Sequence, residues 1–151
     1  MVVDPEKIKK VAIAISDIYA WLDQQIAENT TADKSCFACG QCCNFHAYDH
    51  RLYVTTPEAL CFLYSLKGSE VLDMPDGICP YQKEDKCTVY PFRFAGCRIF
   101  CCKGDAEFQN DLSEQALARF KKMCEGFDLP YCYMELSQVL LALSTGSFLQ
   151  A

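Results

Sequence analysis

Four thiols fall within eight residues of this chain, in the run Cys36-Phe-Ala-Cys39-Gly-Gln-Cys42-Cys43. Two cysteines separated by two residues can fold back around one metal ion, with the intervening N–H groups directed at the sulfurs. A disulfide needs Cα atoms about 4.4–6.8 Å apart and converging Cβ vectors, and a run this dense would need several partners with that geometry. The spacing therefore favours metal ligation over disulfide bonds.

A second group of cysteines follows at Cys79, Cys87, Cys97, Cys101 and Cys102. Cys36, Cys39 and Cys42 have the two-residue spacing of a ferredoxin run, in which the fourth ligand is followed by proline. The distant Cys79 is the cysteine that Pro80 follows here. This combination favours a [4Fe–4S] cluster.

Zinc is the alternative metal. The sequence Cys36-x-x-Cys39-Gly40 also suits a zinc knuckle, because glycine lets the turn tighten under the ion. A second pair, drawn from Cys79, Cys87 or Cys97, would complete a tetrahedral site of four thiolates. The choice between iron–sulfur and zinc stays open at this point.

A site of four thiolates carries a net charge near −2 with either metal, so it needs N–H donors and cations around it. Arg93 and Arg98 flank Cys97 and are the candidate cations, unless they are ordinary surface arginines. His46 and His50 lie four residues apart just after the first cluster, but with thiols so abundant we expect them to be capped or half-exposed side chains rather than ligands.

The remaining thiols have two interpretations. Cys101 and Cys102 are candidate ligands or redox groups, which makes a thiol-based oxidoreductase the rival function. Three further cysteines stand among apolar residues in expected helices, and we predict that they pack in the core: Cys61, Cys124 and Cys132.

Composition narrows the class of protein. A formal net charge of −6 does not suit nucleic-acid binding, which needs a basic surface for the phosphates. No apolar stretch approaches the roughly 20 residues that span a bilayer. The N-terminal residues lack the features of a secretory signal, so we expect a cytoplasmic protein with reduced thiols.

The pattern along the chain predicts a mainly α fold, a small helical domain wrapped around an irregular Cys-rich metal-binding core. We expect a single domain over residues 1–151, with the metal-binding region at 36–102. Asp4 and Pro5 predict a helix over 4–29, and Thr56 with Pro57 predicts a shorter helix that Gly68 ends.

The C-terminal third predicts two more helices. One covers 111–125, opened by a capping box at Asp111-Leu-Ser-Glu114, and the other covers 130–144. Between Gly68 and Gly104 we expect loop, with at most a short hairpin around Cys87–Tyr90.

The segments CFACGQCC and ICPYQKEDKCTVYPFRFAGCR together resemble the YkgJ-type cysteine-cluster proteins, described as a zinc- or iron-chelating domain family. The family pattern is Cys-x2-Cys-x2-Cys-Cys, then Cys-Pro, a Cys before Val/Ile-Tyr, and Arg-Pro-x2-Cys-Arg. The match spans residues 36–98, and one departure is Phe94 where the family has proline.

The resemblance implies a bound metal and a set of seven ligands: Cys36, Cys39, Cys42, Cys43, Cys79, Cys87 and Cys97. Flagellin lysine methylases carry a similar cluster linked to an iron–sulfur centre, which favours iron and keeps a protein-modifying enzyme as an alternative. An accessory protein that transfers electrons or delivers metal, or a module that presents a metal-stapled surface to a protein partner, fits the same residues.

Overall fold

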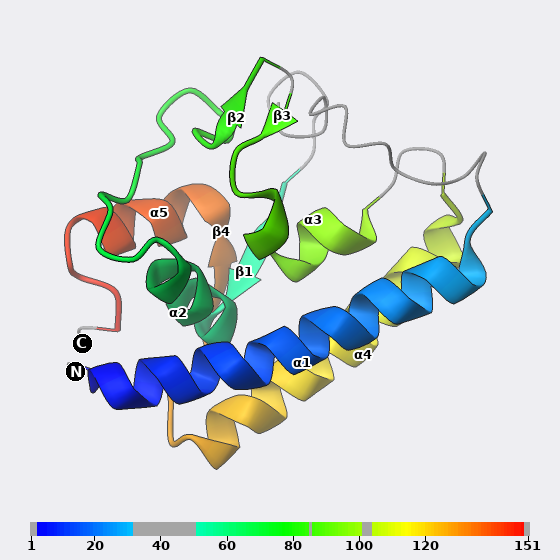
Figure 1. Cartoon of the computed structure of the whole chain (residues 1–151), viewed down its shortest axis with the longest axis horizontal. Coiled ribbons are helices and arrows are strands. Elements are labelled where there is room, and N and C mark those ends of the chain that lie inside the picture. Colours follow the sequence, from blue (N-terminus) through cyan, green and yellow to red (C-terminus); the bar gives the residue numbers. More distant parts are fainter. Residues whose placement is uncertain (1–2, 32–50, 85, 101–103, 150–151) are drawn as a thin grey trace.

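The computed structural model describes residues 3–31, 51–84, 86–100 and 104–149, and over these residues the protein is mainly helical (Figure 1). Two long helices, α1 (Pro5–Asn29) and α4 (Ala106–Gly126), lie along one side of the molecule. The shorter helix α2 (Thr56–Ser65) lies beside α1, and α5 (Leu136–Ser144) lies beyond α2. No helix in the described residues is long and apolar enough to cross a membrane.

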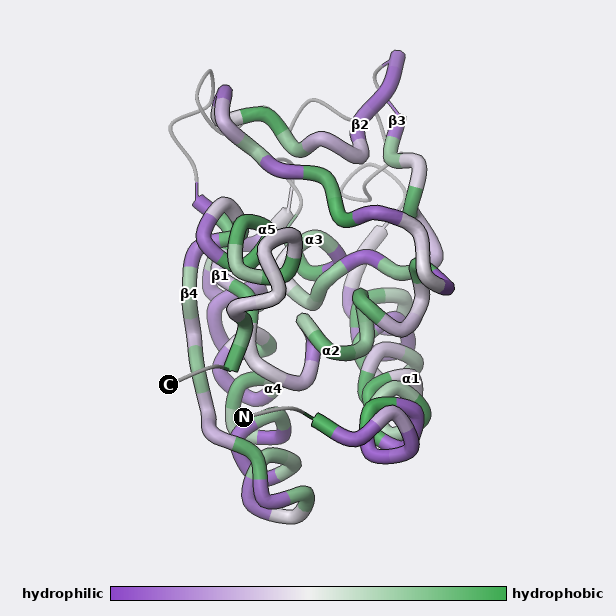
Figure 2. The backbone as a smooth tube through the Cα atoms, turned by 90° about the vertical axis from the view of Figure 1, so that its left-hand side faces the viewer, coloured by the Kyte–Doolittle hydropathy of each residue, from purple (hydrophilic) through white to green (hydrophobic). Residues whose placement is uncertain are grey.

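Helix α1 begins as its sequence predicts. The Asp4 carboxylate accepts a hydrogen bond of 3.1 Å from the Glu6 N–H, and Pro5 occupies the first turn, where its missing N–H costs nothing. One stripe of α1 is fully buried at Val11, Ile15 and Leu22. In Figure 2 hydrophobic and hydrophilic residues alternate along α1 and α4, as expected for helices with one face against a core.

Two clusters of buried apolar side chains form the core, and α2 and the segment 94–99 contribute to both. The first cluster joins α1 to α4, and its members include Ile15, Leu22, Cys61, Leu112 and Phe120. The second joins α2 to α5, and its members include Leu52, Phe62, Phe94, Val139 and Leu140. Helix α2 therefore sits between the long helices and α5.

Two small antiparallel sheets complete the described fold. Strand β1 (Tyr53–Thr55) pairs with β4 (Tyr133–Glu135). Strand β2 (Gln82–Lys83) pairs with β3 (Lys86–Cys87), and Cys87 lies opposite Gln82.

The segment expected to be loop contains more structure than predicted. A 3-10 helix over Tyr90–Phe92 precedes α3 (Ala95–Ile99), which carries Cys97. The expected hairpin is present, and beyond its paired strands the Thr88 N–H donates a 2.7 Å hydrogen bond to the Tyr81 carbonyl. The prediction missed α3 because a helix of five residues shows no sequence periodicity.

Helix α2 starts at Thr56, as predicted, and Thr55 is its cap. Two other predicted helix starts are wrong. Helix α4 starts at Ala106 rather than 111, because Asp105 is the cap and its carboxylate accepts a 3.1 Å bond from the Phe108 N–H. The last helix starts at Leu136 rather than 130, because residues 133–135 extend along β1 instead of coiling.

Candidate metal centre

Three of the predicted ligands, Cys79, Cys87 and Cys97, lie in the described part of the chain. The others lie outside the described residues, as do the two histidines: Cys36, Cys39, Cys42, Cys43, Cys101, Cys102, His46 and His50. Among the described residues, no group of three or more Cys, His, Asp or Glu side chains could hold a metal ion. No disulfide joins any two of the described cysteines.

The three described candidates lie between α2 and α4, Cys87 and Cys97 on short elements and Cys79 in the chain just before β2. Cys79 and Cys97 are half-buried and pack against the second core cluster. The Cys79 carbonyl accepts a 3.1 Å hydrogen bond from the Gln82 N–H, which fixes Cys79 at the base of the β2–β3 hairpin. Cys87 lies on β3 of the same hairpin. Two of the candidates therefore belong to one hairpin, and the third belongs to α3.

Arg98 is a buried structural arginine, so the surface alternative is wrong for this residue. Its side chain is only 6% exposed. Its Nε donates to the Arg93 carbonyl at 2.8 Å and its Nη2 to the Pro91 carbonyl at 2.9 Å. Its Nη1 forms a 2.9 Å ion pair with Asp23 on α1. The guanidinium, which also lies 4.1 Å above the Tyr19 ring, thus ties α3 to α1 and to the turn before it.

Arg93 is bound more loosely in the same region. Its Nη1 donates to the Cys97 carbonyl at 3.3 Å, and its guanidinium stacks 3.6 Å from the centre of the Tyr90 ring. Arg93 is therefore in direct contact with the backbone of a predicted ligand. The hydrogen bonds of Arg98 to described residues use three of its five N–H donors, so Arg98 can donate to further acceptors.

Both arginines line a cleft of about 440 Å³ between α1, α3 and the start of α4. Thr30 and Gly104 line the same cleft. Thr30 lies next to the end of α1, shortly before residues 32–50, and Gly104 directly follows residues 101–103. The chain just before residues 32–50 and the chain just after residues 101–103 thus both lie at the cleft that the two arginines line.

The far side of the 32–50 segment also returns to α3. Leu52 packs so closely on Gly96 that a Cβ at position 96 would collide with the Leu52 Cδ1. A side chain at position 96 would therefore force the end of the Leu52 side chain to move, and Gly96 precedes Cys97 directly.

A single buried carboxylate holds the start of α3. Glu58 is 2% exposed, and its Oε1 accepts a 2.7 Å bond from the Ala95 N–H. Its Oε2 accepts bonds of 3.0 and 2.8 Å from the Thr55 N–H and hydroxyl, which completes the capping box of α2. Burial raises the pKa of Glu58, and these three donors oppose that rise. One side chain thus caps both α2 and α3.

The sequence interpretation missed this role of Glu58, although a signal was present. Thr55 and Glu58 have the S/T-x-x-E spacing of a capping box. The contact to Ala95, 37 residues away, had no sequence signal.

The structure buries two of the three predicted core thiols. Cys61 is 8% and Cys124 is 1% exposed, and burial raises the pKa of each thiol to about 11. Thiols of this kind are protonated and poorly reactive at neutral pH. Cys132 differs from expectation, because it is half-buried and lies before β4 rather than on a helix.

Comparison with known proteins adds no relative: no family model, curated protein or solved structure matches this chain.

Proposed function

We propose that this protein binds metal through its clustered thiolates and holds either an iron–sulfur cluster or zinc. The helices would then wrap around a Cys-rich centre that has an accessory, structural or electron-transfer role. The proposed ligands are Cys36, Cys39, Cys42, Cys43, Cys79, Cys87 and Cys97, with Cys101 and Cys102 as further candidates. The proposed compartment is the reducing cytoplasm, where the thiols stay available.

The observation that carries the proposal is the position of the chain around the 32–50 segment. Thr30 lines the cleft beside Arg98, and Leu52 packs on Gly96. Both ends of the segment that contains four of the thiols therefore lie beside α3, which carries Cys97. A segment of this length can bring its thiols to Cys97 without displacing any described helix.

The charges of this region support the proposal as well. A tetrathiolate site needs cationic or N–H partners around it. Arg93 and Arg98 line the same cleft beside α3, and Arg93 already contacts the Cys97 carbonyl. We propose that both arginines offset the thiolate charge.

Metal analysis of protein purified without oxygen tests the proposal. We expect at least one equivalent of zinc or iron, because protein sites of this type bind tightly enough to survive purification. Less than about 0.5 equivalents of both metals together would refute it. For the choice of metal we propose a [4Fe–4S] cluster, which would make the protein brown and bleach on reduction. Colourless protein with stoichiometric zinc, after growth with ample iron, would reverse this choice.

Substitution of the cysteines separates ligands from core residues. Cys79→Ser and Cys97→Ser should give metal-poor, aggregating protein, because metal-derived folding energy is on the order of 10 kcal/mol in small sites. Cys61→Ala and Cys124→Ala are the matched controls, and they should stay soluble with unchanged metal content at a cost of about 1–2 kcal/mol. Equal metal loss in both pairs would show that the ligands are wrongly assigned.

The alternative function is a thiol- or iron–sulfur-dependent oxidoreductase or protein-modifying enzyme. Cys43, Cys101 and Cys102 favour it, since one cluster does not use all of these thiols. Such an enzyme needs a solvent-accessible thiolate of low pKa. Alkylation of the native metal-loaded protein is the test, and labelling no faster than that of a free thiol would eliminate the thiol-based version.

A further inference from the structure

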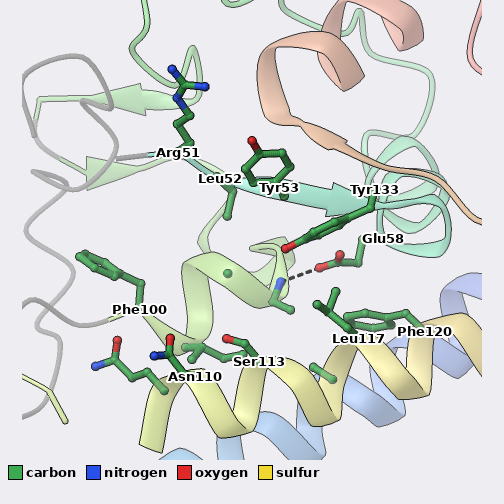
Figure 3. A pocket seen from close by; sticks show the side chains of 15 residues that line it. Arg51, Leu52, Tyr53, Glu58, Phe100, Asn110, Ser113, Leu117, Phe120 and Tyr133 are labelled. Atoms are coloured by element: carbon green, nitrogen blue, oxygen red, sulfur yellow. Dashed lines mark hydrogen bonds between the residues drawn. The ribbon is translucent and has the colours of Figure 1, made fainter. Parts of the chain in front are cut away.

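A second cavity lies beside α3, between β1, α4 and β4 (Figure 3). Its volume is about 220 Å³, below the usual range of roughly 300–1,000 Å³ for drug-sized ligands. Leu52, Ile99, Leu117 and Phe120 supply an apolar lining. The cavity therefore suits a ligand of only a few carbon atoms.

The polar groups of this cavity are concentrated around Glu58. The Glu58 carboxylate lines the cavity, and Figure 3 shows the hydroxyls of Tyr133 and Ser113 directed toward the same space. Tyr133 comes from β4 and Ser113 from α4, so three separate elements hold these oxygens in place. Burial, and then the negative charge of Glu58, raise the pKa of Tyr133, so its hydroxyl keeps its proton at neutral pH.

Glu58 retains capacity for one more donor. A carboxylate has about four acceptor positions. The described hydrogen bonds fill three of them, two on Oε2 and one on Oε1. The remaining position is on Oε1, the oxygen that bonds to Ala95, and Ala95 itself lines the cavity.

The charge of Glu58 determines whether the cavity favours a cation or an anion. Burial raises the pKa of Glu58, and the three donors directed at the carboxylate oppose that rise because they favour its ionised form. Among the described residues, Glu58 has no ion-pair partner. Arg51 lies at the rim, but its side chain is 73% exposed and pairs with Glu135 at 3.0 Å. A cation in the adjoining space would favour the ionised carboxylate further, because an opposite charge close by stabilises the charged form.

We infer that this cavity binds a small primary alkylammonium ion. The three N–H donors of the ammonium group match the three oxygens of Glu58, Tyr133 and Ser113. The alkyl chain contacts the apolar lining, and the Tyr133 ring adds a cation–π contribution. This site is separate from the proposed metal centre, and the inference does not rest on it.

A titration of the ¹⁵N-labelled protein as purified, near neutral pH, tests the inference with three probes of similar size: n-butylamine, n-butanol and butyrate. We expect n-butylamine to shift the backbone signals of Glu58, Ala95 and Ser113 in a saturable way. It should bind at least about 10-fold more tightly than n-butanol, because a charged hydrogen bond is stronger than a neutral one. Butyrate should not bind. Equal affinity for the amine and the alcohol, or shifts spread outside the cavity, would overturn the inference.

Variants test the individual oxygens. Glu58→Gln should weaken n-butylamine binding at least about 10-fold, whereas Ser113→Ala and Tyr133→Phe should each weaken it roughly 5-fold. Ser69→Ala, at an exposed serine outside the cavity, is the control and should bind as the unchanged protein does. If Glu58→Gln does not fold, the affinities of Ser113→Ala and Tyr133→Phe for n-butylamine test the site instead. Unchanged affinity in both of them would refute the site.

Discussion

Replacement of Glu58 by alanine should be among the most destabilising single changes in the described part of the protein. It removes the acceptor of two buried N–H groups, those of Thr55 and Ala95, whose residues are 0% and 6% exposed. A buried donor left without a partner costs about 1–3 kcal/mol, so the pair costs about 2–6 kcal/mol. The substitution also removes the cost of keeping a carboxylate out of water, which offsets part of this loss. We therefore expect about 3 kcal/mol less stability.

Urea denaturation, followed by the helical circular dichroism signal, measures this change. Glu58→Gln keeps the volume and one acceptor oxygen, so it should cost less, about 1–2 kcal/mol. Glu114→Ala, at an exposed position on α4, is the control and should stay within about 0.5 kcal/mol of the unchanged protein. A loss below about 1 kcal/mol for Glu58→Ala, at unchanged denaturant slope, would refute the double-cap explanation.

Three further predictions concern Arg98, its partner Asp23 and the two buried thiols. Arg98→Lys should cost about 2–3 kcal/mol in the same urea assay, because lysine cannot donate to two carbonyls and a carboxylate in one plane. Asp23→Asn, at the 52% exposed partner, should cost less than about 1 kcal/mol. Burial raises the pKa of Cys61 and Cys124 to about 11, so the unfolded chain gives up these protons first as the pH rises. The free energy of unfolding should not depend on these thiols below about pH 8.5, and between there and pH 11 it should fall by up to about 1.4 kcal/mol per pKa unit for each thiol. A Cys61→Ala/Cys124→Ala double variant should show a weaker fall over the same range.

The sequence predicts those parts of the fold that local chemistry decides. The prediction of α1 is correct because Asp4 and Pro5 define the start of the helix and the spacing of its apolar residues defines the buried face. The predicted start of α4 is wrong because Asp105 and Asp111 are equally good caps when each is considered by itself. Phe108 packs against the first core cluster and so favours the earlier start, which is a tertiary effect.

Long-range contacts explain the remaining errors. Residues Tyr133–Glu135 form a strand because β1 is available as a partner. Neither strand shows this pairing in its own sequence. At the candidate metal centre the identity of the thiols follows from the sequence, but the way in which α3 is held does not. Glu58, Arg98 and Leu52 fix α3 through contacts to residues far away in the chain or in another element.

The pairing of β1 with β4 has a consequence for the order in which the protein folds. The Cys132 N–H donates to the Thr56 hydroxyl across 76 residues of chain, and the Thr56 N–H donates back to the Cys132 carbonyl. Contacts this distant pay the full entropy of loop closure, so they form late and slow the folding rate. During synthesis, β1 leaves the ribosome long before its partner exists. We therefore expect α1 and α2 to pack first, while the edge of β1 stays open to other strands until β4 has been made.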